Sequence, residues 1–252
     1  MYLANQSGVG VVYTKNHPSQ DVPMNTELAS KKNLTAAVLA RLLASIPMLG
    51  LLFFLPAGTL AYWEAWVYMA ILFIPITLVA IYLLKNDPAL LERRLQMREQ
   101  QTQQKWIIAL FSLYLLLTFS VPGFDKRFGW SATPAWVVLV ADLIVLLGYV
   151  LFFLVLRENS FAARTVKVEQ GQKVIASGPY SIVRHPMYLG ILLMYGFSPL
   201  ALGSYWGMIP MILLPLLLMV RIQNEEQVLR KELEGYEAYT RQVKYRLIPG
   251  MW

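Results

Sequence analysis

The chain has 252 residues, of which 57% are hydrophobic and 15% charged, and its formal net charge is +7. This composition is too apolar for a soluble domain and predicts an integral membrane protein. The absence of cysteine excludes disulfides, thiolate nucleophiles and cysteine-ligated zinc, and two histidines are too few for a multi-histidine metal site, so no metal is expected.

Residues 1–30 are polar and lack the apolar core of a signal peptide, so we expect them to be disordered. Six apolar segments follow, most of them near the roughly 20 residues that a bilayer-spanning helix needs. They are 34–55, 62–84, 106–121, 134–156, 187–202 and 205–220. Only Gly203 and Ser204 separate the last two, which predicts a tight helical hairpin over 187–220. The predicted fold class is an all-α integral membrane protein with six transmembrane helices, the first four within residues 31–156.

Lysine and arginine are concentrated before the first span, in the loop 85–105, and after the fourth and sixth spans. Lys126 and Arg127 after the third span weaken this pattern slightly. The positive-inside rule then places both termini and the loop 85–105 in the cytoplasm. Topology and attraction to anionic lipid headgroups account for the net charge, so we expect the lipid bilayer, and no nucleic acid, as a partner. The sequence does not define an oligomeric state.

Three ionisable residues fall inside the predicted spans, where charge is costly. Arg41 and Glu64 lie near span ends, which favours a structural or interfacial role. Asp142 lies deeper, and whether it packs against another polar group in the bundle is left open.

The polar segments 157–188 and 221–252 are together long enough to form a small cytoplasmic catalytic cap, built from the loop before the fifth span and a C-terminal helix. Alternating apolar residues from Thr165 to Ile175 predict a short extended or hairpin-like element that turns at Gly171. Pro186 suits the first turn of the fifth span.

The stretch SGPYSIVRHPMYLG places His185 at the start of that span, where unpaired backbone N–H groups favour a carboxylate or a phosphate. Arg184 adds a fixed positive charge, and Tyr180 and Tyr188 offer aromatic faces that bind cations. In the alternative interpretation Arg184 meets lipid phosphates, His185 caps the helix and the tyrosines form an interfacial belt.

The stretch VRIQNEEQVLRKELEGYEAYTRQVKYRLIP continues the sixth span as an amphipathic helix. Arg221 and Glu225 are four residues apart and therefore share one face of that helix. They form either a solvated salt bridge or part of an anion-binding site. Because Arg221 directly follows an apolar run, where an exposed pair gains little energy, the second interpretation is favoured.

The two stretches, together with NDPALLERR at 86–94 and NSF at 159–161, resemble the isoprenylcysteine carboxyl methyltransferase family over residues 86–249, and its bacterial and archaeal members in particular. The resemblance implies an integral enzyme of a bacterial-type inner membrane that uses S-adenosylmethionine as its cofactor. It implies Glu225 as the glutamate that contacts the cofactor, with Glu226 as the alternative. It assigns Arg221 to the methyl acceptor and residues 157–252 to a cofactor-binding region. The cofactor-binding residues that it implies are Gln172, Lys173, Val174, Ile175, Tyr180, Arg184, His185, Pro186, Met187, Tyr188 and Glu225.

The resemblance leaves the acceptor open between an isoprenylcysteine-type or other lipidic or amphipathic carboxylate, a phospholipid amine and a small thiol. An ionised carboxylate needs no general base, whereas an amine does, and Glu226 and Tyr236 are the visible candidates for that catalytic role. A nicotinamide-dependent membrane reductase of the sterol reductase type, or a non-enzymatic scaffold or transporter, would be a different class of protein.

Overall fold

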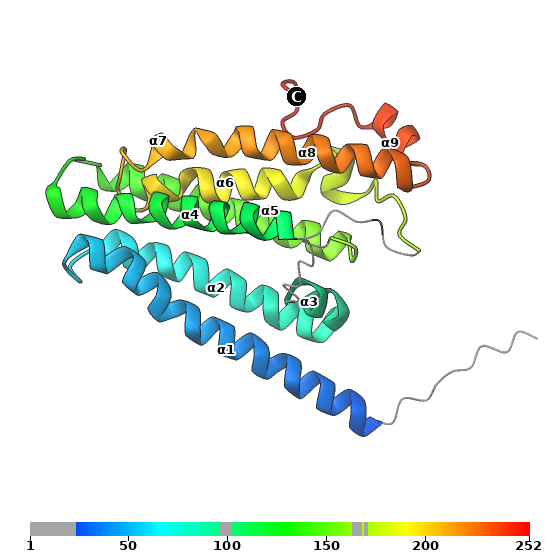
Figure 1. Ribbon diagram of the computed structural model, residues 1–252, viewed down its shortest axis with the longest axis horizontal. Coiled ribbons are helices and arrows are strands. Elements are labelled where there is room, and N and C mark those ends of the chain that lie inside the picture. The colour runs from blue at the N-terminus through cyan, green and yellow to red at the C-terminus, as the bar shows by residue number, and fades with distance from the viewer. Residues whose placement is uncertain (1–23, 96–101, 163–167, 169–170) are drawn as a thin grey trace, which may run out of the picture.

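The computed structural model describes residues 24–95, 102–162, 168 and 171–252, and within them it contains helices and no β-strand. The long helices α1, α2, α4, α5, α6 and α8 lie roughly parallel to one axis and alternate in direction along the chain (Figure 1). The elements are α1 (Met24–Ala57), α2 (Trp63–Asn86), α3 (Pro88–Leu95), α4 (Thr102–Phe128), α5 (Ala135–Glu158), the 3-10 turn η1 (Gly178–Ser181), α6 (Pro186–Ala201), α7 (Met208–Met211), α8 (Leu213–Glu232) and α9 (Tyr236–Gln242).

Four helical segments within the described residues are long and apolar enough to cross a bilayer: Lys32–Ala57, Trp63–Asn86, Ala135–Glu158 and Met208–Glu232. Their outward surfaces expose many large apolar side chains, as expected where lipid covers the protein. The prediction of an all-α integral membrane protein is confirmed at this level. The count of six spans stays a prediction, because α6 is a shorter apolar helix of 16 residues and α4 falls outside the four segments.

Two boundaries differ from those expected. α1 already begins at Met24, so residues 24–30 are helical, while 1–23 lie outside the described residues. The turn of the hairpin is also wider than two residues: α6 ends at Ala201 and the next helix begins only at Met208. Gly203 adopts φ +74°, and the Ser204 hydroxyl hydrogen-bonds to the Asp125 carboxylate, which holds this turn against the end of α4.

Polar side chains also join the helices at the end far from α9. Lys126 Nζ lies 3.0 Å from Glu64 Oε1, so Glu64 has the structural role expected of it. The same ion pair neutralises Lys126, one of the two basic residues that weakened the asymmetry of Lys and Arg between the loops. Asp125 accepts hydrogen bonds from the backbone and the side chain of Ser131. Asp142, in contrast, is buried, and neither of its carboxylate oxygens has a hydrogen-bond partner in the part of the chain that the structure describes. The sequence left open whether Asp142 packs against another polar group in the bundle. Among the described residues it forms no hydrogen bond to one.

The helices α5 and α6 approach each other closely at two glycines. A Cβ atom added to Gly148 would lie 3.0 Å from the Gly190 carbonyl oxygen and 3.0 Å from the Met194 nitrogen. A Cβ atom added to Gly190 would lie 3.1 Å from the Gly148 carbonyl oxygen. Small residues permit this approach between membrane helices, and the approach fixes where α6 begins.

We expect Gly148→Ala to destabilise the protein by about 1 to 3 kcal/mol, because the new methyl group forces the two backbones apart. Gly50→Ala on α1 is the matched control, since a Cβ atom there meets nothing within 4 Å. Thermal unfolding in detergent measures both variants. Equal melting temperatures for the two would contradict the close packing of α5 against α6.

Candidate active site

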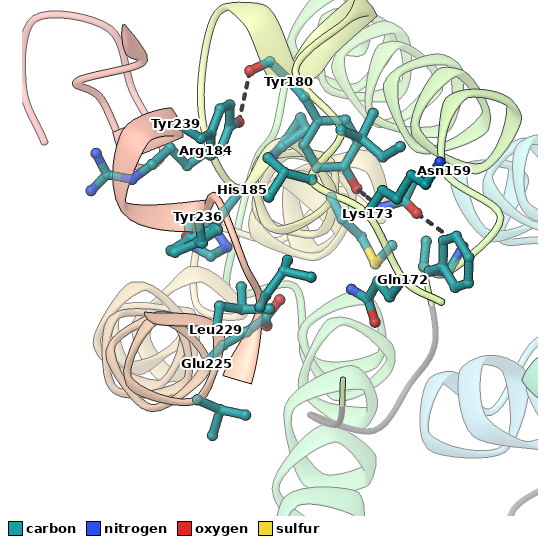
Figure 2. A pocket seen from close by; sticks show the side chains of 18 of the residues that line it. Asn159, Gln172, Lys173, Tyr180, Arg184, His185, Glu225, Leu229, Tyr236 and Tyr239 are labelled. Atoms are coloured by element: carbon teal, nitrogen blue, oxygen red, sulfur yellow. Dashed lines mark hydrogen bonds between the residues drawn. The ribbon is translucent and has the colours of Figure 1, made fainter. Parts of the chain in front are cut away.

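A cavity opens where the segment before α6 meets the polar half of α8 and α9 (Figure 2). The structure brings every residue predicted to bind the cofactor to its wall, and Arg221 as well. In Figure 2, Tyr236 and Tyr239 reach the cavity from one side and Asn159, Gln172 and Lys173 from the other. Glu226, the other predicted catalytic residue, does not line the cavity.

Tyr188, on the first turn of α6, joins the two charged residues of α8 that share a face. Its hydroxyl donates to Glu225 Oε2 at 2.5 Å and accepts a hydrogen bond from Arg221 Nε at 2.8 Å. The guanidinium carbon of Arg221 lies 5.9 Å from the centre of the Tyr188 ring. One buried phenol therefore holds a cation and an anion in fixed positions at the end of the apolar helices.

Glu226 does not line the cavity, and its carboxylate contacts two guanidinium groups and one imidazole ring. Arg184 Nε lies 2.8 Å and His185 Nε2 3.3 Å from its Oε1, and Arg246 Nε lies 3.0 Å from its Oε2. Charge-assisted hydrogen bonds from the two guanidinium groups stabilise the ionised form of this carboxylate. Such a carboxylate stays ionised and is a weak base, so its geometry supports a positioning role.

The start of α6 is bound to the C-terminal segment through the backbone. The N–H groups of Arg184 and His185 donate to the carbonyl oxygens of Tyr245 and Arg246, each at 2.9 Å. Arg184 Nη1 also donates to the carbonyl oxygens of Val243 and Lys244. These donors, predicted to favour an anionic ligand, are thus used within the protein. His185 does occupy the N-cap position, but its side chain makes no capping hydrogen bond.

Asn159, a residue to which the sequence analysis gave no role, shapes the opposite wall. Its Nδ2 donates to the Tyr180 hydroxyl at 2.9 Å, and its Oδ1 accepts from the Phe161 N–H group at 2.9 Å. Burial raises the pKa of Tyr180 to about 12, so its hydroxyl remains protonated. The NSF motif was the available signal, since an asparagine directly after a helix is positioned to bind the following backbone.

The predicted extended or hairpin-like element is present only as a turn. Gly171 adopts φ +79°, and the chain from Gln172 to Ile175 lines the cavity without forming a strand. Residues 163–167 and 169–170 of that element lie outside the described residues. The turn predicted at Gly171 is present, and no β-ladder forms over 172–175 within the described residues.

The aromatic tail supplies the remaining wall. Tyr236 and Tyr239 of α9 pack with Leu233 and Val243, and Val174 and Leu229 cover this cluster. Tyr239 donates to the Tyr180 carbonyl oxygen at 2.7 Å. Burial raises the pKa of Tyr236 above its usual value, so this hydroxyl is a poor general base.

Fold and site together define a helical membrane protein with a polar and aromatic cavity where its apolar helices end. Residues 137–231, nearly all of α5 to α8, match the isoprenylcysteine carboxyl methyltransferase (ICMT) family. The resemblance is confirmed over these residues, where the chain is similar to that family. This match supports a membrane methyltransferase in general. No curated protein matches the chain.

Proposed function

We propose that the protein is an S-adenosylmethionine-dependent membrane methyltransferase that esterifies the carboxylate of a lipidic, isoprenylcysteine-type acceptor. The observation that carries this proposal is the bridge from Arg221 through the Tyr188 hydroxyl to Glu225, inside a cavity next to apolar helices. The bridge places a cation for the acceptor beside an anion for the cofactor. With the basic residues in the cytoplasm, the cavity opens on the cytoplasmic face.

The chemistry of the cavity fits the proposed cofactor. Glu225 offers a carboxylate to its positive charges, and Tyr180 and Tyr188 offer aromatic faces. The backbone of Gln172–Ile175 and the apolar side chains of Val174 and Leu229 suit its uncharged part. When bound, S-adenosylmethionine would supply a methyl group on its sulfonium sulfur. An acceptor oxygen would attack the methyl carbon in line with the C–S bond, and S-adenosylhomocysteine would leave.

The residues of the chain act by orientation. Arg221 is exposed and follows the apolar run that ends at Val220, so it can meet a carboxylate held by a lipid. Its guanidinium binds a carboxylate through paired donors and so aims one oxygen into the cavity. No proton has to be removed from an ionised carboxylate. Alignment and the exclusion of water by Met187 and Phe161, which line the cavity, then account for the rate.

An amine acceptor is disfavoured by the state of the two predicted bases. The Glu226 carboxylate is held outside the cavity by Arg184, Arg246 and His185, and the buried Tyr236 phenol keeps its proton. Neither group is suited to deprotonate an ammonium. A carboxylate acceptor requires no such group, which is why it is the acceptor proposed.

Calorimetric titration of the purified protein with S-adenosylmethionine and, separately, with NADPH tests the class of enzyme. We expect S-adenosylmethionine to bind with about 5 to 8 kcal/mol, corresponding to low micromolar to sub-millimolar affinity. Preferential binding of NADPH would instead identify a reductase.

The same titration tests the site. His185→Ala and Tyr188→Phe should each weaken binding of S-adenosylmethionine, because His185 lines the cavity and the Tyr188 hydroxyl holds Glu225. Unchanged affinity in both variants would place the cofactor elsewhere.

A further inference from the structure

Four tyrosines line the cavity, and three of their hydroxyls have hydrogen-bond partners within the protein: Tyr180, Tyr188 and Tyr239. The fourth, Tyr236, is only 4% exposed, and its hydroxyl has no partner among the described residues. Buried hydroxyls are nearly always paired, because an unpaired one loses its hydrogen bonds to water without replacement. A ligand in the cavity would supply the missing partner.

The face of α8 that borders the cavity changes character along its length. Arg221, Glu225, Leu229 and Leu233 follow one another at intervals of four residues, and all four line the cavity. The two charged residues lie next to the apolar end of the helix, and the two leucines lie toward α9. The cavity therefore has a charged end beside the membrane helices and an apolar end beside Tyr236.

The apolar end is built for a flat and uncharged group. Leu229 and Leu233 pack with Val174 and Tyr239 around Tyr236, so apolar and aromatic surfaces surround a single unpaired hydroxyl. Glu226 and Arg184, whose charges act on Tyr236, are paired with each other, so a charged ligand group would lose its hydration for little gain. A heteroaromatic base has apolar faces and hydrogen-bonding atoms only at its edge, which matches this arrangement.

We propose that the Tyr236 hydroxyl hydrogen-bonds the edge of the purine of an S-adenosyl ligand, whose base lies between Leu229, Leu233 and Val174. This inference rests on the proposed function and adds the orientation of the S-adenosyl ligand in the cavity. With the base at the α9 end, the charged amino-acid and sulfur part of the ligand extends toward Glu225 and Arg221. The transferred methyl group then faces the membrane side, where Arg221 holds the acceptor.

Tyr236→Phe tests the inference in the full-length protein, with S-adenosylhomocysteine as the probe. The variant should bind the probe about tenfold more weakly, while its melting temperature without ligand stays equal or rises, because an unpaired hydroxyl has been removed. Tyr114→Phe is the matched control: its hydroxyl donates to the Pro210 carbonyl oxygen at 2.7 Å, outside the cavity. The control should lower the melting temperature and leave the affinity unchanged.

A second probe keeps the test independent of the stability of the variant. S-inosylhomocysteine differs from S-adenosylhomocysteine at the purine edge, so the wild-type protein should distinguish the two, and Tyr236→Phe should distinguish them less. Equal discrimination by both proteins, or unchanged affinity of the variant, overturns the role of Tyr236. Failure of the wild-type protein to bind any S-adenosyl ligand overturns the proposed function itself.

Discussion

Glu226→Ala is expected to lower the free energy of unfolding by about 3 to 5 kcal/mol, the usual cost of removing one partner from a buried ion pair. The side chains of Arg184 and His185 are only 5% and 3% exposed, so both would remain buried beside each other without the carboxylate. The C-terminal segment would also lose the contact between Arg246 and Glu226. Thermal unfolding in detergent, combined with limited proteolysis of the segment after α9, measures both effects.

Glu237→Ala is the matched control for this experiment. Glu237 pairs with Arg230 at 2.6 Å, but the two side chains are 55% and 41% exposed. Exposed pairs contribute about 0 to 1 kcal/mol, so this variant should unfold close to the wild-type temperature. Equal shifts for the two variants would show that Glu226 does not hold the tail to the start of α6.

Arg221→Ala and Glu225→Ala should damage different steps, although both residues contact the same hydroxyl. Arg221→Ala should slow methyl transfer while largely sparing cofactor binding, because in the proposed function Arg221 orients the acceptor. Glu225→Ala should weaken cofactor binding itself. Removal of a charge-assisted contact costs about 1.5 to 3 kcal/mol, so changes of roughly ten- to a hundredfold are expected. Cofactor titrations paired with single-turnover rates on an active lipid acceptor separate the two quantities.

Arg230→Ala serves as the control for the loss of a positive charge from α8, since Arg230 pairs with Glu237 on the exposed side of the helix. It should leave both the affinity and the rate near the wild-type values. If Arg221→Ala and Glu225→Ala instead lowered the melting temperature equally and changed neither quantity, the bridge through Tyr188 would be a structural element only.

The sequence predicted the all-α membrane fold and most of the residues that line the cavity. Long apolar runs have few structural alternatives to membrane helices. Arg221 and Glu225 follow from helical periodicity, and the structure places both on the cavity. The same periodicity separates Glu226 from them, since it lies five residues after Arg221 and four after the fully buried Ile222. This spacing is visible in the sequence, and it predicts that Glu226 lies on a different face of the helix from Arg221 and Glu225.

Other features could not be read from local patterns. The carbonyl oxygens of Tyr245 and Arg246 accept hydrogen bonds from the N–H groups of Arg184 and His185, which lie far earlier in the chain. No motif near either segment predicts that pairing. The alternation around Gly171 resembled a strand because period-two patterning arises wherever one side of an extended segment is buried. The close approach of Gly148 to Gly190 is likewise a property of two helices together.

The helix α8 runs unbroken from Leu213 to Glu232, so its lipid-facing half and the half that lines the cavity form one rod. Membrane helices adapt to thinner or thicker bilayers by tilting. A tilt of α8 moves Arg221 relative to Tyr188, which belongs to α6, and so alters the distance on which the bridge depends. The acyl-chain length of the surrounding lipids thereby becomes a determinant of turnover.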